Sequence, residues 1–255
     1  MTKVFTTFFE HLGQYASFLM SLFNRPERRS VFFKQTIHEI NNIGIGSFGI
    51  VSLISIFTGA VSTIQIGVQL VGSLVPSHML GAFVRDSNVL EFSPTITCLV
   101  LAGKVGSNIA SEIGTMKVTE QIDALEIMGI NSVNYLALPK IIAGIISIPL
   151  LVTYSMLLSI FGGAISGEMS DLITLDSYIK GLRTSFIPFT IYFAIIKATV
   201  FAFLITSISA FEGYRTEGGA LEVGQSSTKA VLYSAVAVII FDYIISNTFI
   251  DQLSV

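Results

Sequence analysis

The sequence predicts an all-α protein that crosses a membrane about five times, and three observations lead to that prediction. Charged residues are 12% of the 255 residues, about half the share of roughly a quarter that soluble domains carry. Hydrophobic residues are 52% of the chain, and the mean hydropathy is +0.75. The apolar residues gather in runs that reach the roughly 20 residues a helix needs to cross a bilayer. This composition argues against a soluble enzyme and against a disordered chain.

The remaining composition excludes several functions. A net charge of −3 supplies no basic field for nucleic acid. The single cysteine, Cys98, rules out an intrachain disulfide and a cysteine-rich metal site. The three histidines are far apart in the sequence, so no metal cluster or catalytic triad is visible. We expect no catalytic residues, no metal site and no cofactor in this chain.

Residues 1–24 form the first predicted element, because apolar side chains recur there at helical spacing. We expect an amphipathic helix in the membrane interface, with packing against the rest of the protein as the alternative. A basic segment follows, which suits anionic headgroups. We therefore divide the chain into an interfacial segment, 1–34, and a single transmembrane domain, 35–255. The basic residues are Arg25, Arg28, Arg29 and Lys34.

Five apolar stretches follow. The first, 43–75, has 33 residues without a charge, or about 50 Å of helix against a hydrocarbon core of roughly 30 Å. We expect it to be tilted, broken or partly re-entrant. The other predicted spans are 89–109, 138–163, 186–211 and 230–250.

Polar segments connect these spans. We expect a short turn at 76–88, an acidic helix within 111–134, an amphipathic helix over 169–183 and a Gly-rich loop at 212–229. Of the 14 lysines and arginines, ten fall on the N-terminal side of the membrane, three on the other side and Lys197 within a span. Because cations concentrate on the cytoplasmic side, we expect the N-terminus and the acidic helix to be cytoplasmic, and the helix over 169–183 to be extracytoplasmic.

Two glycine-rich segments partly match nucleotide-binding motifs. The string from Gly44 to Gly49 fits a dinucleotide fingerprint but opens a membrane span and follows no strand. The string from Gly219 to Ser226 resembles a P-loop whose lysine is replaced by Gln225. We expect neither to bind a nucleotide.

Ionisable residues within spans are costly and therefore candidates for function. We expect Lys197 to pair with Asp242, with direct contact of these residues with substrate as the alternative to structural pairing. The four candidates are Glu91, Lys104, Lys197 and Asp242.

The acidic helix carries a second candidate site. An apolar stripe runs through Val118, Ile122, Leu125 and Met128, beside acidic residues at three-residue steps. Like charges at this spacing repel by a few tenths of a kcal/mol per pair, so the helix either docks a basic partner or is simply solvated. The acidic residues are Glu120, Asp123 and Glu126.

Residues 114–129 and 135–139 closely resemble the signature of the MlaE/YrbE permease family. These are membrane subunits of ABC transporters that move phospholipid between the membranes of double-membraned bacteria and chloroplasts. Further similar segments are 57–61 with Gln65, 103–107, 112–114, Lys197, 213–231 and Asp242-Tyr243.

The resemblance implies a homodimeric permease that encloses a lipid cavity and meets an MCE-domain substrate-binding protein at 169–183. It implies that ATP and Mg bind only to a separate cytoplasmic ATPase, so that this chain is not an enzyme. It further implies a bacterial inner membrane, with the chloroplast inner envelope as the alternative, and a part in outer-membrane lipid asymmetry. The implied ATPase-coupling residues are Lys117, Glu120, Asp123, Ala124, Leu125, Glu126, Met128 and Gly129, and the lipid-pathway candidates are Gln65, Gln69, Glu91, Lys104, Lys197 and Asp242.

One segment departs from the family pattern. The family usually has Arg-Glu-Leu-Gly-Pro where this chain has Leu90-Glu91-Phe92-Ser93-Pro94. Without that arginine, Glu91 is expected to lack its partner unless Arg85 or Lys104 replaces it.

A rival hypothesis is a secondary transporter or channel that uses the four intramembrane charges as an ion or proton relay. It needs no ATPase, but it leaves the acidic helix without a role. An intramembrane enzyme would need paired aspartates, a Ser–His arrangement or a His cluster, and the sequence shows no such motif.

Overall fold

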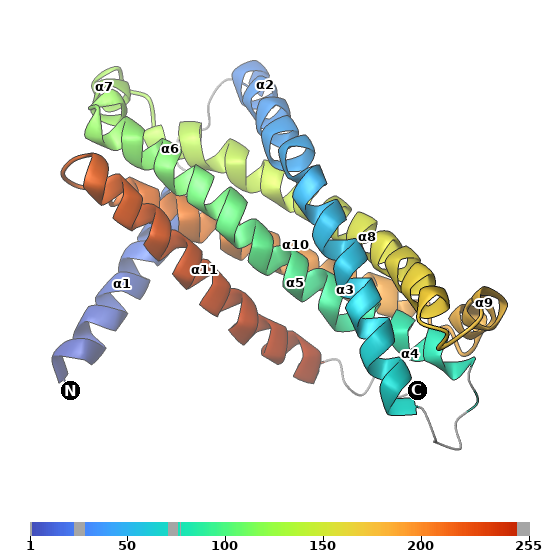
Figure 1. Cartoon of the computed structure of the whole chain (residues 1–255). Coiled ribbons are helices and arrows are strands. Elements are labelled where there is room, and N and C mark those ends of the chain that lie inside the picture. The colour runs from blue at the N-terminus through green and yellow to red at the C-terminus, as the bar shows by residue number, and fades with distance from the viewer. Residues whose placement is uncertain (1, 23–28, 71–75, 77, 249–255) are drawn as a thin grey trace. The chain divides into compact units, whose positions relative to one another are not determined.

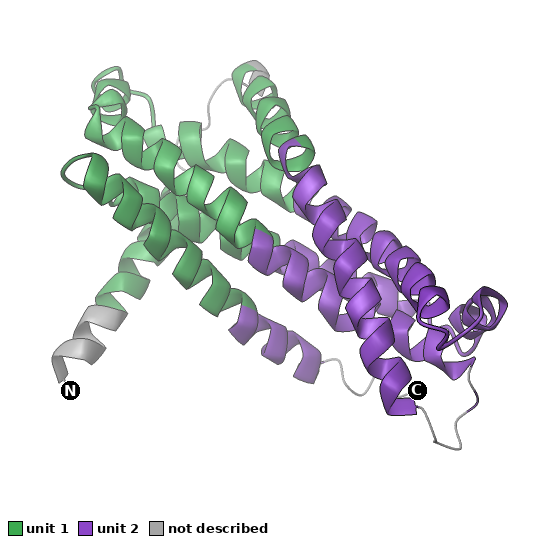
Figure 2. Ribbon diagram, in the orientation of Figure 1, with its two compact units in different colours: residues 1–45, 101–147, 202–238 green, residues 46–100, 148–201, 239–255 purple. Residues whose placement is uncertain are grey.

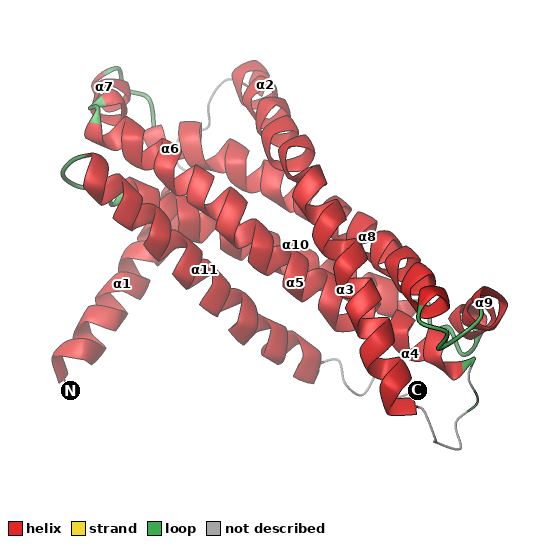
Figure 3. Ribbon diagram, viewed as in Figure 1, coloured by secondary structure: helices red, strands yellow, loops and turns green. Residues whose placement is uncertain are grey.

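The computed structural model describes residues 2–22, 29–70, 76 and 78–248, and every regular element within these ranges is a helix (Figures 1 and 3). Three short π-helical stretches, labelled η, interrupt the α-helices. In chain order the elements are α1 (Thr2–Ser21), α2 (Arg29–Ile40), η1 (Asn41–Ile45), α3 (Gly46–Leu70), α4 (Met79–Ser87), η2 (Asn88–Phe92), α5 (Ser93–Leu101), η3 (Ala102–Gly106), α6 (Ser107–Val118), α7 (Gln121–Ile127), α8 (Ser132–Met169), α9 (Leu175–Arg183), α10 (Phe189–Tyr214) and α11 (Ala220–Thr248).

Five helical stretches among the described residues are long and apolar enough to cross a membrane, which confirms the predicted number of spans. Each extends beyond its predicted limits at one end at least, because helices continue past the apolar run into polar sequence. The five stretches are Val31–Leu70, Met79–Val118, Ser132–Met169, Phe189–Tyr214 and Ala220–Thr248.

The first span is one continuous helical stretch up to Leu70 rather than a broken or re-entrant segment. The chain is helical from Arg29 to Leu70, and a single π-helical turn at Asn41–Ile45 lies within it. Gly44, Gly46 and Gly49 all belong to this stretch, so the string that imitates a dinucleotide fingerprint is helical. Residues 71–75 of the predicted span, like Arg25 and Arg28, lie outside the described residues.

The predicted turn at 76–88 is wrong, since α4 occupies Met79–Ser87. Its charged residues suggested a solvated turn, but only 4% of Arg85 is exposed. The buried arginine is bonded to backbone carbonyls, and a sequence alone does not reveal such partners.

The predicted loop at 212–229 is also mostly helix, because α10 continues to Tyr214 and α11 begins at Ala220. Oε2 of Glu222 accepts a hydrogen bond from the backbone N–H of Gly219 at 2.8 Å and so satisfies a donor at the start of α11. The string that resembles a P-loop is therefore the beginning of a helix. In the same way, the acidic segment 111–134 is divided among the end of α6, α7 and the start of α8, and α9 is shorter than the predicted 169–183 helix.

The helices form two compact units, which Figure 2 colours separately. Within unit 1 (1–45, 101–147 and 202–238), α1 packs on the end of α10. The ring of Phe18 lies 5.7 Å from those of Phe211 and Tyr214, centroid to centroid, and Tyr15 shares a 2.6 Å hydrogen bond with Ser207. One part of α1 therefore packs on the rest of the protein, which is the alternative to a helix that lies only in the membrane interface. Its other apolar side chains Phe9, Leu12 and Met20 are exposed.

Within unit 2 (46–100, 148–201 and 239–255), α4 and α9 share a small core. It contains Leu80, Val84, Ile173 and Tyr178, all buried. Burial raises the pKa of Tyr178 to about 12, so its hydroxyl stays protonated and donates to the carbonyl of Ile160 at 3.2 Å. This bond and the shared core hold α9 against the rest of unit 2.

Small residues let α3 and α8 approach closely in unit 2, as is common between membrane helices. A Cβ atom at Gly59 would lie 1.7 Å from the carbonyl oxygen of Ser159, so no larger residue fits without separating the helices. Ser55 Oγ also donates to Ser155 Oγ at 2.8 Å.

Candidate functional site

A buried lysine holds two carboxylates together in unit 2. Lys197 on α10 has a fully buried side chain, and its Nζ lies 2.8 Å from Glu91 Oε2 and 2.5 Å from Asp242 Oδ1. The predicted Lys197–Asp242 pair is therefore present, and Glu91 joins it. We call Glu91, Lys197 and Asp242 the ion cluster.

Neutral groups complete the hydrogen bonding of the ion cluster. Lys197 Nζ also donates to Ser246 Oγ at 3.0 Å and to the carbonyl of Leu90 at 3.2 Å. Leu90 and Glu91 belong to the π-helical turn η2, and π turns leave carbonyls outside the regular ladder and recur at functional sites. Ser246 donates to Glu91 at 3.2 Å, and Thr95 donates to Asp242 at 3.1 Å.

The expectation that Glu91 lacks a partner is wrong. Lys197 takes the place proposed for Arg85 or Lys104, although it lies 106 residues away in the sequence. Arg85 is bonded elsewhere in unit 2, and Lys104 is exposed on η3 in unit 1. Gln65 and Gln69, the other lipid-pathway candidates, are exposed on α3 and do not belong to the ion cluster.

The ion cluster carries one excess negative charge, because two carboxylates face one ammonium. Asp242 is mostly covered, whereas 46% of the Glu91 side chain is exposed. A carboxylate that is bonded on one side and open on the other can attract a cationic group such as an ammonium.

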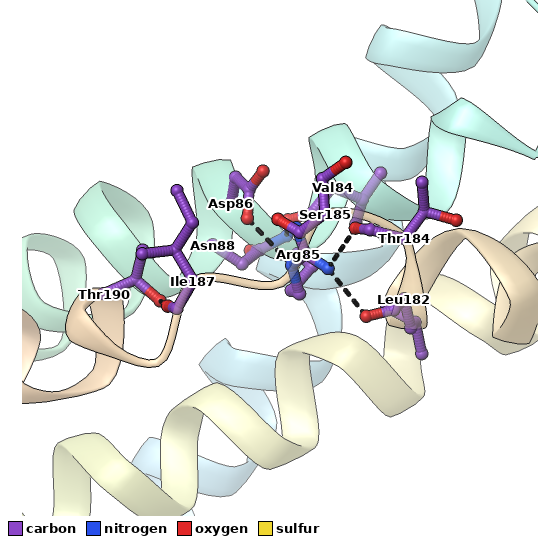
Figure 4. A network of polar contacts seen from close by, with 9 residues as sticks. All are labelled: Val84, Arg85, Asp86, Asn88, Leu182, Thr184, Ser185, Ile187 and Thr190. Atoms are coloured by element: carbon purple, nitrogen blue, oxygen red, sulfur yellow. Dashed lines mark hydrogen bonds and ion pairs between the residues drawn. The ribbon is translucent and has the colours of Figure 1, made fainter. Parts of the chain in front are cut away.

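Arg85 joins α4 to the segment that follows α9 in unit 2 (Figure 4). Its Nη1 donates to the carbonyls of Leu182 and Thr184 at 2.6 and 2.9 Å, and its Nη2 donates to that of Ser185 at 3.4 Å. Its Nε donates to Asp86 at 2.8 Å. These bonds satisfy carbonyls at the end of a helix, which would otherwise need another donor.

We expect Arg85→Gln to destabilise the protein by roughly 3 kcal/mol, since a hydrogen bond to a charged group contributes about 1.5–3 kcal/mol and several are lost together. The measurement is the thermal unfolding midpoint of the purified protein in detergent. Arg183→Gln is the control, because Arg183 is an exposed arginine at the end of α9. Equal midpoints for the two variants would contradict the structural role of Arg85.

The acidic helix α7 exposes a mixed surface in unit 1. Ile122 is buried and anchors the helix, whereas Ile127 and Met128 are 88% and 65% exposed. The three acidic residues, Ala124 and Gly129 are exposed, and Leu125 is half-buried. Apolar side chains held in solvent beside carboxylates are typical of a contact surface for another protein.

Short bonds and special backbone angles set the position of α7. Lys117 Nζ lies 2.7 Å from Asp123 Oδ1, and Ser132 Oγ donates to Glu126 Oε1 at 2.8 Å. Glu120 begins the helix with a φ of 60°, and Gly129 ends the turn with a φ of 78°. The predicted coupling residues are thus held around one short helix.

The sequence prediction missed a second buried cluster, which lies in unit 1. Lys140 is 2% exposed, and its Nζ lies 2.6 Å from Glu39 and 2.7 Å from Glu112. Lys140 is the third residue of the predicted span 138–163, so the sequence assigns it to the cations at the cytoplasmic end of that span rather than to the intramembrane charges. A lysine directly after Pro139 in an apolar run was the signal that could have revealed it.

No group of three or more His, Cys, Asp or Glu side chains that could hold a metal occurs among the described residues.

Comparison with known sequences decides the family. The family described as "Permease MlaE" matches residues 36–248.

The chain belongs to the MlaE permease family.

Its relatives agree with this membership. A Rickettsia bellii protein named "Probable ABC transporter permease protein" is 32% identical over 94% of this chain and 92% of its own length. A Synechocystis protein of the same description is 31% identical over 90% of this chain and 85% of its own. The Arabidopsis thaliana chloroplastic protein named TRIGALACTOSYLDIACYLGLYCEROL 1 is 35% identical over 86% of this chain and 62% of its own.

This MlaE-family chain is a multi-pass membrane protein and the permease subunit of an ABC transporter. Permease subunits of this kind are not catalytic, and an ATPase partner supplies the hydrolysis of ATP.

Proposed function

We propose that this permease moves glycerophospholipid between the inner and outer membranes of a double-membraned bacterium. A homodimer of the chain would enclose the lipid, an ATPase would dock on α7, and an MCE-domain protein would meet α9. The observation that carries the proposal is family membership together with a charged cluster inside the predicted spans.

The ATPase contact is supported by the surface of α7. Its exposed acidic edge suits a basic groove, and its exposed apolar residues supply burial once a partner covers them. The secondary-transporter hypothesis gives this surface no role.

The proposed membrane orientation is supported by the five spans and the distribution of cations. If each stretch crosses once, α1, α7 and the segment 215–219 share one side, and α9 lies on the other. The excess of lysine and arginine on the first side favours a cytoplasmic location for that side. The exposed apolar side chains of α1 then suit the membrane interface.

The homodimer is supported by two spans whose side chains are mostly not buried within a single chain. We compare the burial of an 18-residue apolar stretch from each span. In the first and last spans 28% and 17% of this stretch is buried, compared with 50% or more in the other three. Their exposed residues can face lipid or a second copy of the chain. Phe57, Val61 and Ile64 on α3 and Val236, Ile240 and Tyr243 on α11 are among them.

The lipid pathway is supported by the open carboxylate of Glu91. An ion pair with no further task is usually covered, because exposed charge within a bilayer is costly. Half-exposed Glu91 can approach the headgroup of a passing lipid while Lys197 holds its carboxylate in place.

The proposal predicts that lipid transfer needs ATP. We expect the permease, reconstituted with its ATPase and MCE-domain protein in liposomes, to transfer fluorescent glycerophospholipid to acceptor vesicles only when ATP is hydrolysed. Fluorescence dequenching measures the transfer, and a hydrolysis-deficient ATPase is the control. Ion or proton flux through the permease alone, with no lipid transfer, would instead support the secondary transporter or channel.

A further inference from the structure

We propose that a polar cavity in unit 1, distinct from the ion cluster, binds a zwitterionic phosphodiester such as the phosphoethanolamine headgroup of a membrane lipid. The cavity holds about 220 Å³ and lies where α1, the end of α10 and the beginning of α11 meet. Its ionisable lining residues are His11, Glu212, Arg215, Glu217, Glu222 and Lys229.

A buried carboxylate points to a cationic ligand. Glu212 is only 5% exposed and lines the cavity, and no hydrogen bond or ion pair joins its carboxylate to a described residue. Arg215 and Lys229 on the same cavity act on this carboxylate only through longer-range charge interaction. Burial of a carboxylate with no directly bonded partner is costly, and a ligand ammonium inside the cavity would supply that partner.

Two cations on the same cavity point to an anionic group. Arg215 and Lys229 are exposed and form no ion pair with a carboxylate within the described ranges. Nη1 of Arg215 lies 2.7 Å from His11 Nδ1, and its guanidinium lies over the ring of Phe211 at 5.4 Å, so this cation is held in place. Arginine and lysine together are the usual recognition groups for a phosphate.

The other two acidic residues do not cancel this pattern. Glu222 already accepts the bond from the Gly219 N–H, and Glu217 is exposed at the edge. The cavity therefore offers a carboxylate in its buried part and cations at its exposed part. That separation of charge matches a ligand with an ammonium and a phosphodiester.

The size and position of the cavity favour a headgroup over a complete lipid. Sites that enclose a drug-sized molecule measure roughly 300–1,000 Å³, so a cavity of about 220 Å³ suits a small polar group. Exposed Tyr233 also lines the cavity, and Tyr and Lys are typical of the boundary between membrane and water. The acyl chains could then remain in the bilayer, in the leaflet on the side of α1.

Native mass spectrometry of the full chain in detergent tests the proposal with phosphatidylethanolamine and phosphatidylglycerol. We expect the wild-type protein to retain phosphatidylethanolamine roughly tenfold better, because only this lipid carries the ammonium for Glu212. Glu212→Gln should remove that preference, whereas Lys229→Gln should weaken the retention of both lipids. Equal retention of the two lipids by the wild type, or an unchanged ratio in Glu212→Gln, would overturn the proposal.

Control variants make the result specific. Glu10→Gln changes an exposed carboxylate on α1 that does not line the cavity, so it should keep the wild-type ratio. If Glu212→Gln fails to fold, Lys229→Gln provides the test, because Lys229 is exposed. The proposal would be overturned if Lys229→Gln kept the wild-type ratio of phosphatidylethanolamine to phosphatidylglycerol and retained both lipids as well as the wild type does. Competition by soluble glycerophosphoethanolamine identifies a water-soluble ligand for the same site, and lack of competition identifies the membrane lipid.

The site is independent of the proposed transport. A triple variant of the ion cluster, Glu91→Gln with Lys197→Met and Asp242→Asn, should keep the phosphatidylethanolamine preference. Loss of lipid transfer without loss of this preference would count against the transport proposal alone. Loss of the preference in this variant would place the preferred lipid at the ion cluster and overturn the cavity proposal.

Discussion

The double variant Glu120→Lys with Asp123→Lys is expected to abolish association with the ATPase while leaving membrane insertion intact. Both carboxylates are exposed at the start of α7, Glu120 as its N-cap and Asp123 in its first turn. A charge-assisted hydrogen bond contributes about 1.5–3 kcal/mol, so two reversals should weaken docking by roughly a hundredfold or more. Copurification of the ATPase with the tagged permease measures the effect.

The structure adds a necessary control to this experiment. Asp123 is bonded to Lys117 at 2.7 Å, so its reversal also removes an internal ion pair. Lys117→Gln removes that pair and keeps both carboxylates, and we expect it to retain most of the ATPase. Glu168→Lys with Asp176→Lys reverses two exposed charges on the opposite side of the membrane in the proposed topology. Normal copurification of the ATPase with the α7 double variant would refute the docking role.

The second large effect is expected for Lys197→Met. It leaves the carboxylates of Glu91 and Asp242 without their shared cation, and removal of one partner from a buried ion pair costs about 3–5 kcal/mol. We expect a clear fall in the thermal unfolding midpoint, lower yield from the membrane and no lipid transfer. A wild-type midpoint would show that the ion cluster does not stabilise the fold.

The triple variant of the ion cluster separates stability from transport. Glu91→Gln, Lys197→Met and Asp242→Asn together remove every charge, and replacing a whole buried ion group is often neutral or stabilising. We expect this protein to fold and to bind its ATPase, yet to transfer no lipid. Wild-type transfer by the triple variant would assign the ion cluster to structural pairing alone.

Most errors of the sequence prediction lie at helix ends and polar connections. Arg85 and Asp86 suggested a turn, but carbonyls after α9 hold Arg85 inside the protein. The segment from 220 to 229 suggested a loop, but Ser226 and Ser227 are buried in unit 1 and α11 continues through them. Local polarity predicts exposure only when no distant partner binds the polar group.

The candidate site was likewise predicted only in part: the sequence identified its residues but not their contacts. The cost of ionised groups in a bilayer made Glu91, Lys197 and Asp242 visible in the sequence. Their common cluster depends on helices brought together by folding, since Lys197 meets Glu91 across 106 residues. Lys104 was equally visible but belongs to unit 1, and Lys140 was missed because its two carboxylates lie in other helices.

The sequence by itself determined the class of this protein, its five spans and its acidic helix between the second and third of them. It could do so because charged side chains are costly inside a bilayer, so the segments without charge indicate where the chain crosses the membrane. Only the tertiary structure decided which charges meet, where helices end and which carboxylate remains unpartnered in a cavity. Those outcomes depend on side chains far apart in the sequence, and their energies arise only once the helices have packed together.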